Sequence, residues 1–171
     1  MKTHHSMKKI LRYASLISLL VGLSAVSATA LKVGDAAPDF AVLDTQGIQR
    51  TMADYRGRMV IVNFWATYCP PCRQEKPSME QFYLKNKNQG LELLAVTGER
   101  KRAIERYLKK YPLSFEVLRD YTGSMHRDYA VLSYPQSFVV DRSGTIVHIF
   151  FGPQDWTGSL VTEMISPLLA E

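Results

Sequence analysis

The chain has 171 residues, with 21 Lys and Arg against 16 Asp and Glu, and it contains only two cysteines. Residues 1–30 contain four of the basic residues and no acidic residue. Residues 31–171 therefore carry 17 basic and 16 acidic residues. This balance excludes a strongly basic nucleic-acid-binding protein, because neutralising phosphates requires a surplus of positive charge, and no nucleic-acid partner is expected. Two cysteines are too few for a disulfide-stabilised scaffold.

The first thirty residues have the pattern of an export signal. A basic segment, residues 1–12, precedes an uncharged apolar stretch over residues 13–26 and the small-residue sequence Ala28-Thr29-Ala30. We predict a signal peptide over residues 1–30, cleaved after its last residue, and a periplasmic location for a single domain over residues 31–171. The alternative is an uncleaved leader that anchors the protein to the inner membrane, since the uncharged run just reaches the roughly 18 to 20 residues of a spanning helix.

Strand-like and helix-like segments alternate along the rest of the chain. A nearly continuous apolar and β-branched run over residues 59–65 predicts a strand at the centre of a sheet, covered on both faces. After Cys72, apolar residues recur with helical spacing, which predicts a helix with one buried stripe. This stripe contains Met79, Phe82 and Tyr83.

The second half of the domain continues this alternation. Residues 91–97 predict another inner strand, and residues 101–111 predict a helix with one apolar and one charged face. Two β-branched runs, residues 136–140 and 145–151, flank an Asp- and Gly-containing turn and predict a hairpin. Apolar residues between Leu160 and Ile165 predict a closing helix. Strands joined through helices indicate an α/β sandwich with a mixed sheet.

The two cysteines form the sequence Cys69-Pro-Pro-Cys72, directly after the predicted central strand and at the start of a helix. Proline is tolerated in a first helical turn, where its missing N–H donor costs nothing. A sulfur at a helix N-terminus faces unpaired backbone N–H groups, which stabilise the thiolate and lower its pKa. We therefore expect Cys69 to be the nucleophile and Cys72 to resolve the mixed disulfide, which closes a redox-active Cys69–Cys72 disulfide.

The alternative interpretation of two cysteines at this spacing is half of a structural zinc site. A four-coordinate site needs two more ligands, and the histidines after residue 31, His126 and His148, are 22 residues apart rather than closely paired. No metal site and no cofactor are therefore expected.

The sequence resembles the thioredoxin-like superfamily and, within it, the extracytoplasmic TlpA/ResA/DsbE-like thiol-disulfide oxidoreductases. The resemblance covers nearly all of the domain. It implies a thioredoxin fold, which is a three-layer α/β/α sandwich with a central mixed sheet and an N-terminal β-hairpin extension. The segments that carry it are Gly34 to Phe40, Val60 to Thr67, Cys69 to Pro77 and Tyr129 to Asp141.

The resemblance also suggests a catalytic role for Glu75, which follows Cys72 by three residues and lies on a neighbouring face of the helix. The corresponding glutamate of ResA-like relatives is thought to take the proton of the resolving cysteine. The alternative is a solvated acid that interacts favourably with the helix dipole. Thioredoxins carry a buried Asp where Asn63 stands, and because Asn does not titrate, acid–base assistance must come from elsewhere.

Three further residues are implicated in substrate binding. The resemblance implies a cis bond between Tyr134 and Pro135, which would leave the Tyr134 backbone free to pair with an extended substrate strand. Tyr68 stands where relatives often have Trp, and it keeps an aromatic side chain beside Cys69. The relatives' Gly-x-Pro-Thr-Thr loop is replaced by Ser133-Tyr-Pro-Gln-Ser137, so their substrate preference is not transferred.

The function expected from these features is the reduction of protein disulfides in the periplasm. The resemblance suggests apocytochrome c as the substrate and a membrane thiol reductant of the DsbD/CcdA type as the electron donor. Oxidation or isomerisation of envelope proteins would use the same residues. A peroxiredoxin-like peroxidase is a weaker alternative, because Ala66 stands where those enzymes have Thr, and a haem- or metal-handling binding module is the non-enzymatic one.

Overall fold

The computed structural model describes residues 30–170 and contains a seven-stranded sheet in the order β2-β1-β5-β4-β3-β6-β7. The inner strands β3, β4 and β5 are parallel, and every other strand joins its neighbours in antiparallel fashion. The strands are β1 (Ala41–Asp44), β2 (Gln49–Thr51), β3 (Met59–Phe64), β4 (Leu91–Thr97), β5 (Glu116–Arg119), β6 (Gln136–Val140) and β7 (Ile146–Phe151).

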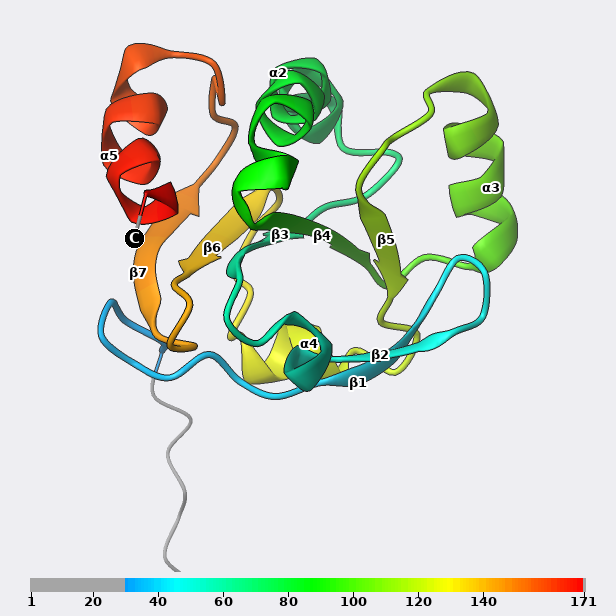
Figure 1. Cartoon of the computed structure of the whole chain (residues 1–171). Coiled ribbons are helices and arrows are strands. Elements are labelled where there is room, and N and C mark those ends of the chain that lie inside the picture. The colour runs from blue at the N-terminus through cyan, green and yellow to red at the C-terminus, as the bar shows by residue number, and fades with distance from the viewer. Residues whose placement is uncertain (1–29, 171) are drawn as a thin grey trace, which may run out of the picture.

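Helices cover both faces of this sheet (Figure 1). One face packs against α2, α3 and α5, whereas the other packs against α4 and the short turn η1. The predicted three-layer α/β/α sandwich with a mixed sheet is therefore confirmed, as is its N-terminal hairpin, β1–β2. The helical elements are η1 (Met52–Tyr55), α2 (Pro70–Asn86), η2 (Lys87–Gln89), α3 (Lys101–Lys110), α4 (Ser124–Asp128) and α5 (Ser159–Leu169).

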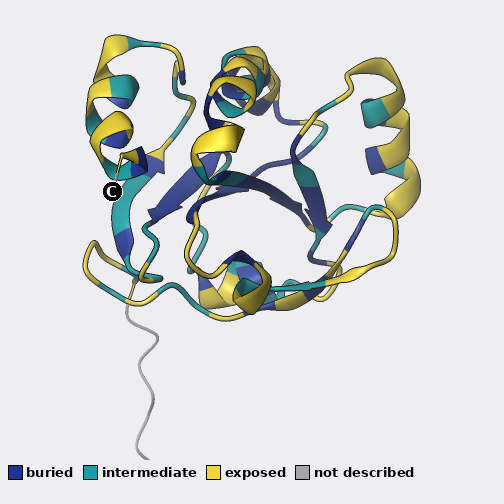
Figure 2. Ribbon diagram, in the orientation of Figure 1, coloured by how far each residue is buried: buried dark blue, intermediate teal, exposed yellow. Residues whose placement is uncertain are grey.

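The strand β3 lies inside the sheet between β4 and β6, and all six of its residues are buried (Figure 2). Its side chains alternate between the two cores: Met59 and Ile61 face α2, whereas Val60 and Phe64 face α4. By the same alternation Asn63 lies on the α2 face. The sheet thus places one polar side chain beneath the helix that carries the two cysteines.

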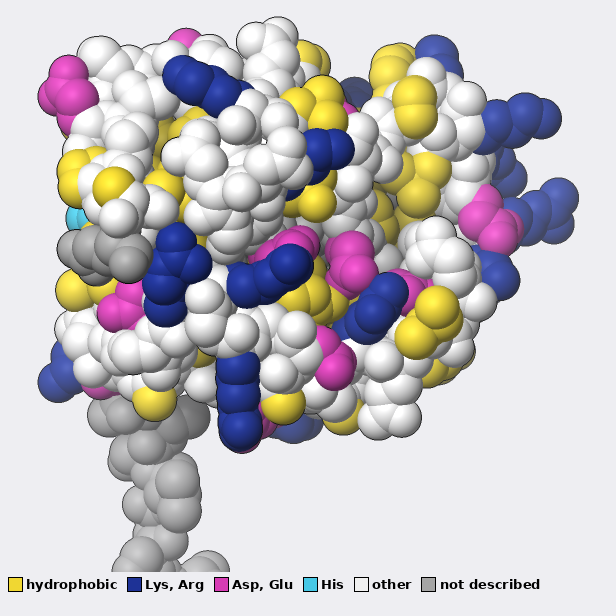
Figure 3. Space-filling view, viewed as in Figure 1, with side chains coloured by type: hydrophobic (Ala, Val, Ile, Leu, Met, Phe, Trp, Pro, Cys, Tyr) yellow, Lys and Arg dark blue, Asp and Glu magenta, His cyan; other side chains and the backbone are white. Residues whose placement is uncertain are grey.

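The helix α3 confirms the predicted amphipathic pattern. Ile104 and Tyr107 are buried, while the opposite face carries exposed basic residues, which gather at the edge of the molecule over α3 (Figure 3). The helix ends at Lys110, one residue before the predicted end, and Tyr111 is about half exposed. The basic residues are Lys101, Arg102, Arg106, Lys109 and Lys110.

A short strand and a short α-helix were not predicted. The strand β5 has only four residues, with a charged residue at each end, and α4 is little more than one helical turn. Neither is long enough to show a hydrophobic period, so each depends on its packing against the rest of the fold. The strand β5 is nevertheless essential to the architecture, since it joins the N-terminal hairpin to the parallel strands.

The predicted signal peptide lies outside the described residues, apart from Ala30 at its end. Within residues 30–170, no helix combines the length and the apolar character needed to cross a membrane.

Candidate active site

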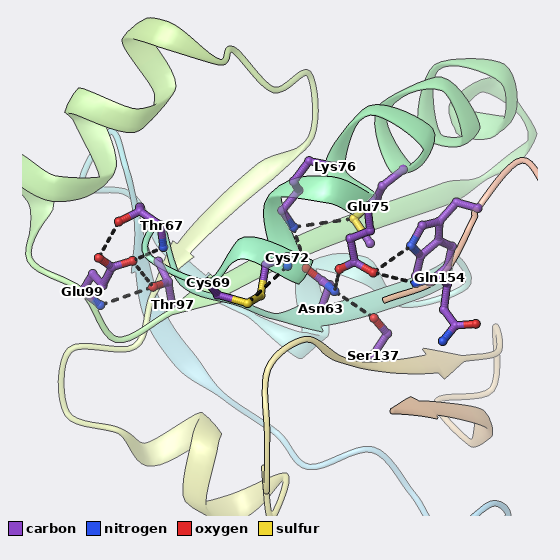
Figure 4. Close-up of a disulfide and its surroundings, with 12 residues drawn as sticks. Asn63, Thr67, Cys69, Cys72, Glu75, Lys76, Thr97, Glu99, Ser137 and Gln154 are labelled. Atoms are coloured by element: carbon purple, nitrogen blue, oxygen red, sulfur yellow. Dashed lines mark hydrogen bonds between the residues drawn. A yellow bond between two sulfur atoms is a disulfide. The ribbon is translucent and has the colours of Figure 1, made fainter. Parts of the chain in front are cut away.

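The two cysteines lie at the junction between β3 and α2, as predicted, and they form a disulfide (Figure 4). Cys69 is the N-cap residue of α2, and Pro70 and Pro71 occupy the first turn. The backbone N–H of Cys72 donates a hydrogen bond to Sγ of Cys69 at 3.2 Å. Cys69 is 7% exposed whereas Cys72 is fully buried, so an incoming sulfur meets Cys69 first.

Glu75 lies one turn further along α2, and its carboxylate is buried with only 3% exposure. The Nδ2 group of Asn63 donates to Oε1 at 2.9 Å. The backbone N–H of Gln154 donates to Oε2 at 3.1 Å, and the indole N–H of Trp156 lies 3.5 Å from the same oxygen. The alternative of a solvated acid is therefore wrong, because Glu75 points into the molecule.

Asn63 connects this carboxylate to two other elements. Its Nδ2 group also donates to the hydroxyl of Ser137 at 2.8 Å, a contact that follows from the register of β3 and β6, in which the two residues are direct partners. Its Oδ1 atom accepts a hydrogen bond from Nζ of Lys76 at 2.6 Å. A side chain that does not titrate thus joins an acid and a base behind the disulfide.

Lys76 is as buried as Glu75, at 3% exposure. Besides Asn63, its ammonium lies 3.7 Å from Sδ of Met79 and over the rings of Trp65 and Phe115, at 4.7 and 5.6 Å from their centroids. These contacts with a thioether and two aromatic faces replace water around the charge.

Burial changes the proton affinity of both groups. Removal from water raises the pKa of Glu75, and the positive charge of Lys76 and the hydrogen bonds from Gln154, Asn63 and Trp156 only partly oppose this effect. Removal from water likewise lowers the pKa of Lys76 to about 8, and the negative charge of Glu75 opposes it. The arrangement can hold or release a proton near neutral pH.

The loop before β6 brings Tyr134 and Pro135 to the same end of the sheet. Phe64 pairs with Gln136, so the two residues before β6 lie beside the residues that follow β3. The Tyr134–Pro135 bond is cis, as predicted. Tyr134 is partly buried and its ring packs edge-on against His126, whereas Tyr68 is 70% exposed at the active-site turn.

A second carboxylate lies on the Cys69 side of the disulfide. Glu99, just after β4, accepts hydrogen bonds from the backbone N–H of Thr67 at 2.5 Å and from its hydroxyl at 2.7 Å. The hydroxyl of Thr97 lies 3.4 Å away. Glu99 thereby fixes the turn between β3 and Cys69, as Figure 4 shows.

The structure thus brings Cys69, Cys72 and Glu75 together (Figure 4). Tyr134, from the loop before β6, packs against the apolar cluster that contains both cysteines. Sequence reasoning missed Lys76, although a signal was present: it follows Cys72 by four residues and precedes Met79 by three, so it stands on the apolar stripe of α2. The contacts of Gln154 and Trp156 had no such local signal.

The comparisons with known proteins agree with this site. Residues 33–149 match the model of the AhpC/TSA family. Relatives named thiol-disulfide oxidoreductase ResA include one from Geobacillus kaustophilus, 38% identical over 125 residues that make up 72% of each chain. Another from Bacillus subtilis is 35% identical over 133 residues, which cover 77% of this chain and 71% of that relative.

Solved structures show the same similarity. A structure from Chlorobium tepidum, designated as a thiol:disulfide interchange protein DsbE, has a TM-score of 0.77 and 33% sequence identity, and it covers 82% of this chain and 99% of its own. A thioredoxin family thiol:disulfide interchange protein from the same organism has a TM-score of 0.71 and 26% identity, with the same coverage. The fold is therefore the thioredoxin fold. The chain belongs to the AhpC/TSA family and, within it, to the ResA- and DsbE-like thiol-disulfide oxidoreductases.

Proposed function

We propose that the protein is exported, with residues 1–30 as its signal peptide or anchor, and that it reduces protein disulfides in the periplasm. The observation that carries this proposal is the buried carboxylate of Glu75, one helical turn from the buried Cys72. A reductase must release its substrate through attack by the resolving cysteine. That attack needs a base, because a buried thiol is a poor nucleophile until it loses its proton.

The proposed cycle begins with the thiolate of Cys69, which attacks one sulfur of the substrate disulfide. This breaks the substrate's S–S bond, forms a mixed disulfide and releases one substrate sulfur as a thiolate, which takes a proton from water. Cys72 then transfers its proton to Glu75, and its thiolate attacks Sγ of Cys69. The mixed disulfide breaks, the second substrate sulfur leaves and is protonated, and Cys69–Cys72 is oxidised as the substrate gains two electrons.

Substrate recognition is assigned to the side chains around Cys69. Tyr68 presents an exposed aromatic ring beside the reactive sulfur, and aromatic surfaces of this kind are common anchors for peptide side chains. Tyr134 precedes Pro135 and the strand β6, and its backbone can pair with an extended substrate segment. In this scheme the substrate is an unfolded or extended polypeptide that places its disulfide over Cys69.

The partners follow from the resemblance to the ResA and DsbE branches. Apocytochrome c, whose haem-attachment cysteines must be reduced, is the proposed substrate. A membrane thiol reductant of the DsbD/CcdA type is the proposed electron donor, since each turnover leaves Cys69–Cys72 oxidised and requires a second exchange to restore it.

The test is to trap mixed disulfides with Cys72→Ser in the native compartment and to identify the bound proteins. This variant can form the bond through Cys69 but cannot resolve it. Recovery of apocytochromes would support cytochrome maturation, whereas a broad set of envelope proteins would contradict it. Equilibration of the wild-type protein with thiol buffers gives the direction: a reductase should have a potential nearer about −270 than about −120 mV.

A peroxidase is the second candidate because of the family match. Thr67 has the only hydroxyl next to the position occupied by Ala66, and that hydroxyl donates to Glu99. Peroxide consumption by Cys72→Ser would favour this function, and its absence would remove it.

A further inference from the structure

Lys76 is the buried charge for which the exchange cycle has no use. Its position in α2, between the apolar contacts of Trp65, Met79 and Phe115, would suit a leucine or a methionine. An apolar side chain there would avoid the free-energy cost of burying an ammonium group. The chain instead places a lysine there, four residues after Cys72, so both side chains lie on one face of the helix.

The contacts of Lys76 lead to one acidic group. Its ammonium donates to Oδ1 of Asn63, and Nδ2 of the same amide donates to Oε1 of Glu75. The amide is thereby oriented with its negative end toward the ammonium and its positive end toward the carboxylate. Ser137 accepts the second Nδ2 hydrogen and keeps the amide from turning over. Asn63 therefore transmits the charge of Lys76 to Glu75 through two aligned hydrogen bonds.

Lys76 is the charged group that acts most strongly on the carboxylate of Glu75. The groups that contact this carboxylate from β3 and from the segment before α5 are a side-chain amide, a backbone N–H and an indole. Glu75 is in turn the charged group that acts on Lys76. The charge of each group therefore favours the ionised form of the other.

We propose that Lys76 is a positioning residue of the active site, whose buried positive charge, relayed through Asn63, keeps the carboxylate of Glu75 ionised and able to accept the proton of Cys72. This role rests on the proposed function of Glu75 as the base. Without Lys76, a carboxyl with this little exposure holds its proton at higher pH and cannot serve as a base at neutral pH. The lysine itself exchanges no proton with the sulfurs.

The direct experiment measures the ionisation of Glu75 by carbon NMR of the full chain, with its carboxyl carbon labelled and its signal assigned by its absence in Glu75→Gln. Lys76→Met, which removes the charge and fills the space, should raise the titration midpoint of Glu75 by about one pH unit or more. Lys85→Met removes an exposed lysine from the same helix and should leave the midpoint in place. An unchanged or lowered midpoint in Lys76→Met would overturn the proposal.

A second variant separates the charge from the packing. Lys76→Gln keeps a hydrogen-bond donor for Asn63 but carries no charge, so it should give the same shift as Lys76→Met. If Lys76→Gln titrates like the wild type, the hydrogen bond and not the charge controls Glu75, and the proposal is wrong. The unsubstituted protein provides a check that needs no variant: the Glu75 signal should show a second inflection where the side-chain carbon of Lys76 titrates, and its absence would count against the pairing.

The kinetic consequence distinguishes this proposal from the one on which it rests. The acid limb of the pH profile for substrate release should move to higher pH in Lys76→Met by the same amount as the NMR midpoint. The double variant Glu75→Gln/Lys76→Met should behave like Glu75→Gln alone. If Glu75→Gln leaves the wild-type pH profile unchanged, the base role of Glu75 fails, while the NMR midpoint still decides whether Lys76 sets the ionisation of Glu75.

Discussion

Two carboxylates of this protein are both buried and yet differ in proton affinity. Glu75 in α2 is 3% exposed and Asp120 before α4 is 1% exposed. Burial raises the pKa of Glu75 above its usual range. Burial acts in the same direction on Asp120, but hydrogen bonds from the side chain and backbone of His126 and from the backbone of Met125 outweigh it and hold the pKa below its usual range.

The donor sets explain the difference. Asp120 accepts from Nδ1 of His126 at 2.6 Å, from the backbone N–H of the same residue at 2.9 Å and from the hydroxyl of Ser124 at 3.2 Å, all within six residues. The donors to Glu75 come from β3 and from the segment before α5, at 2.9 to 3.5 Å. A tight local donor set makes a carboxylate structural, whereas a looser, long-range set leaves it ready to take a proton.

The largest expected effect is on the rate of disulfide reduction, which should depend on Glu75 far more than on Asp120. Glu75→Gln should slow disulfide reduction at neutral pH by about 10²- to 10⁴-fold, the usual contribution of a general base. Asp120→Asn should change the rate by less than about tenfold, which corresponds to 1.36 kcal/mol of activation free energy. The measurement is single-turnover reduction of a peptide disulfide. Equal rates in both variants would remove the distinction.

The free energy of unfolding should depend strongly on Asp120, although the rate of disulfide reduction should not. Asp120→Asn should lower the free energy of unfolding at pH 7 by about 1.5 to 3 kcal/mol, because hydrogen bonds to a charged group are lost. Urea unfolding followed by the fluorescence of Trp65 and Trp156, both fully buried, measures this loss. Asp128→Asn, at the exposed end of α4, is the matched control and should stay within about 0.5 kcal/mol.

The pH dependence of stability sharpens the comparison further. The raised pKa of Glu75 means that the native state holds a proton that the unfolded chain releases, so stability falls as pH rises from the usual carboxyl range toward the folded value. The lowered pKa of Asp120 gives a rise in stability with pH below that range. Each slope is limited to about 1.36 kcal/mol per pH unit.

These slopes can be assigned by difference. Glu75→Gln should flatten the fall in unfolding free energy with rising pH, and Asp120→Asn should flatten the rise at low pH. Both slopes are measured by urea unfolding between about pH 2 and pH 8, a range that spans the ordinary carboxyl pKa values near 4. If Glu75→Gln flattens the low-pH rise instead, the directions assigned to the two carboxylates are reversed.

The smallest expected effect concerns two serines, one in the hydrogen-bond network of Glu75 and one in that of Asp120. Ser137→Ala removes the acceptor for Asn63 in a buried site and should cost about 0.5 to 1.5 kcal/mol of unfolding free energy. Ser124→Ala removes a longer hydrogen bond at a half-buried site and should cost less. Thermal unfolding resolves the order of the two variants, and a larger loss for Ser124→Ala would contradict it.

The sequence predicted the elements that are long enough to show a period. The strands β3 and β4, the β6–β7 hairpin and the helices α2, α3 and α5 all follow from apolar spacing, because burial on a sheet or one helix face imposes that spacing. The strand β5 and the helix α4 are too short to show one. Their conformation depends on neighbouring elements, as in the pairing of β5 with β4 and β1.

The candidate site likewise has features that sequence spacing predicted and features that depend on tertiary packing. Sequence spacing alone placed Cys69 at a helix N-terminus, Cys72 one turn further and Glu75 near it, because a helix repeats every 3.6 residues. Only the tertiary structure decided that Glu75 is buried and that its donors include Gln154 and Trp156, 79 and 81 residues away. Proton affinity depends on water exclusion and on which dipoles and charges surround a group, and these arise only when distant segments pack together.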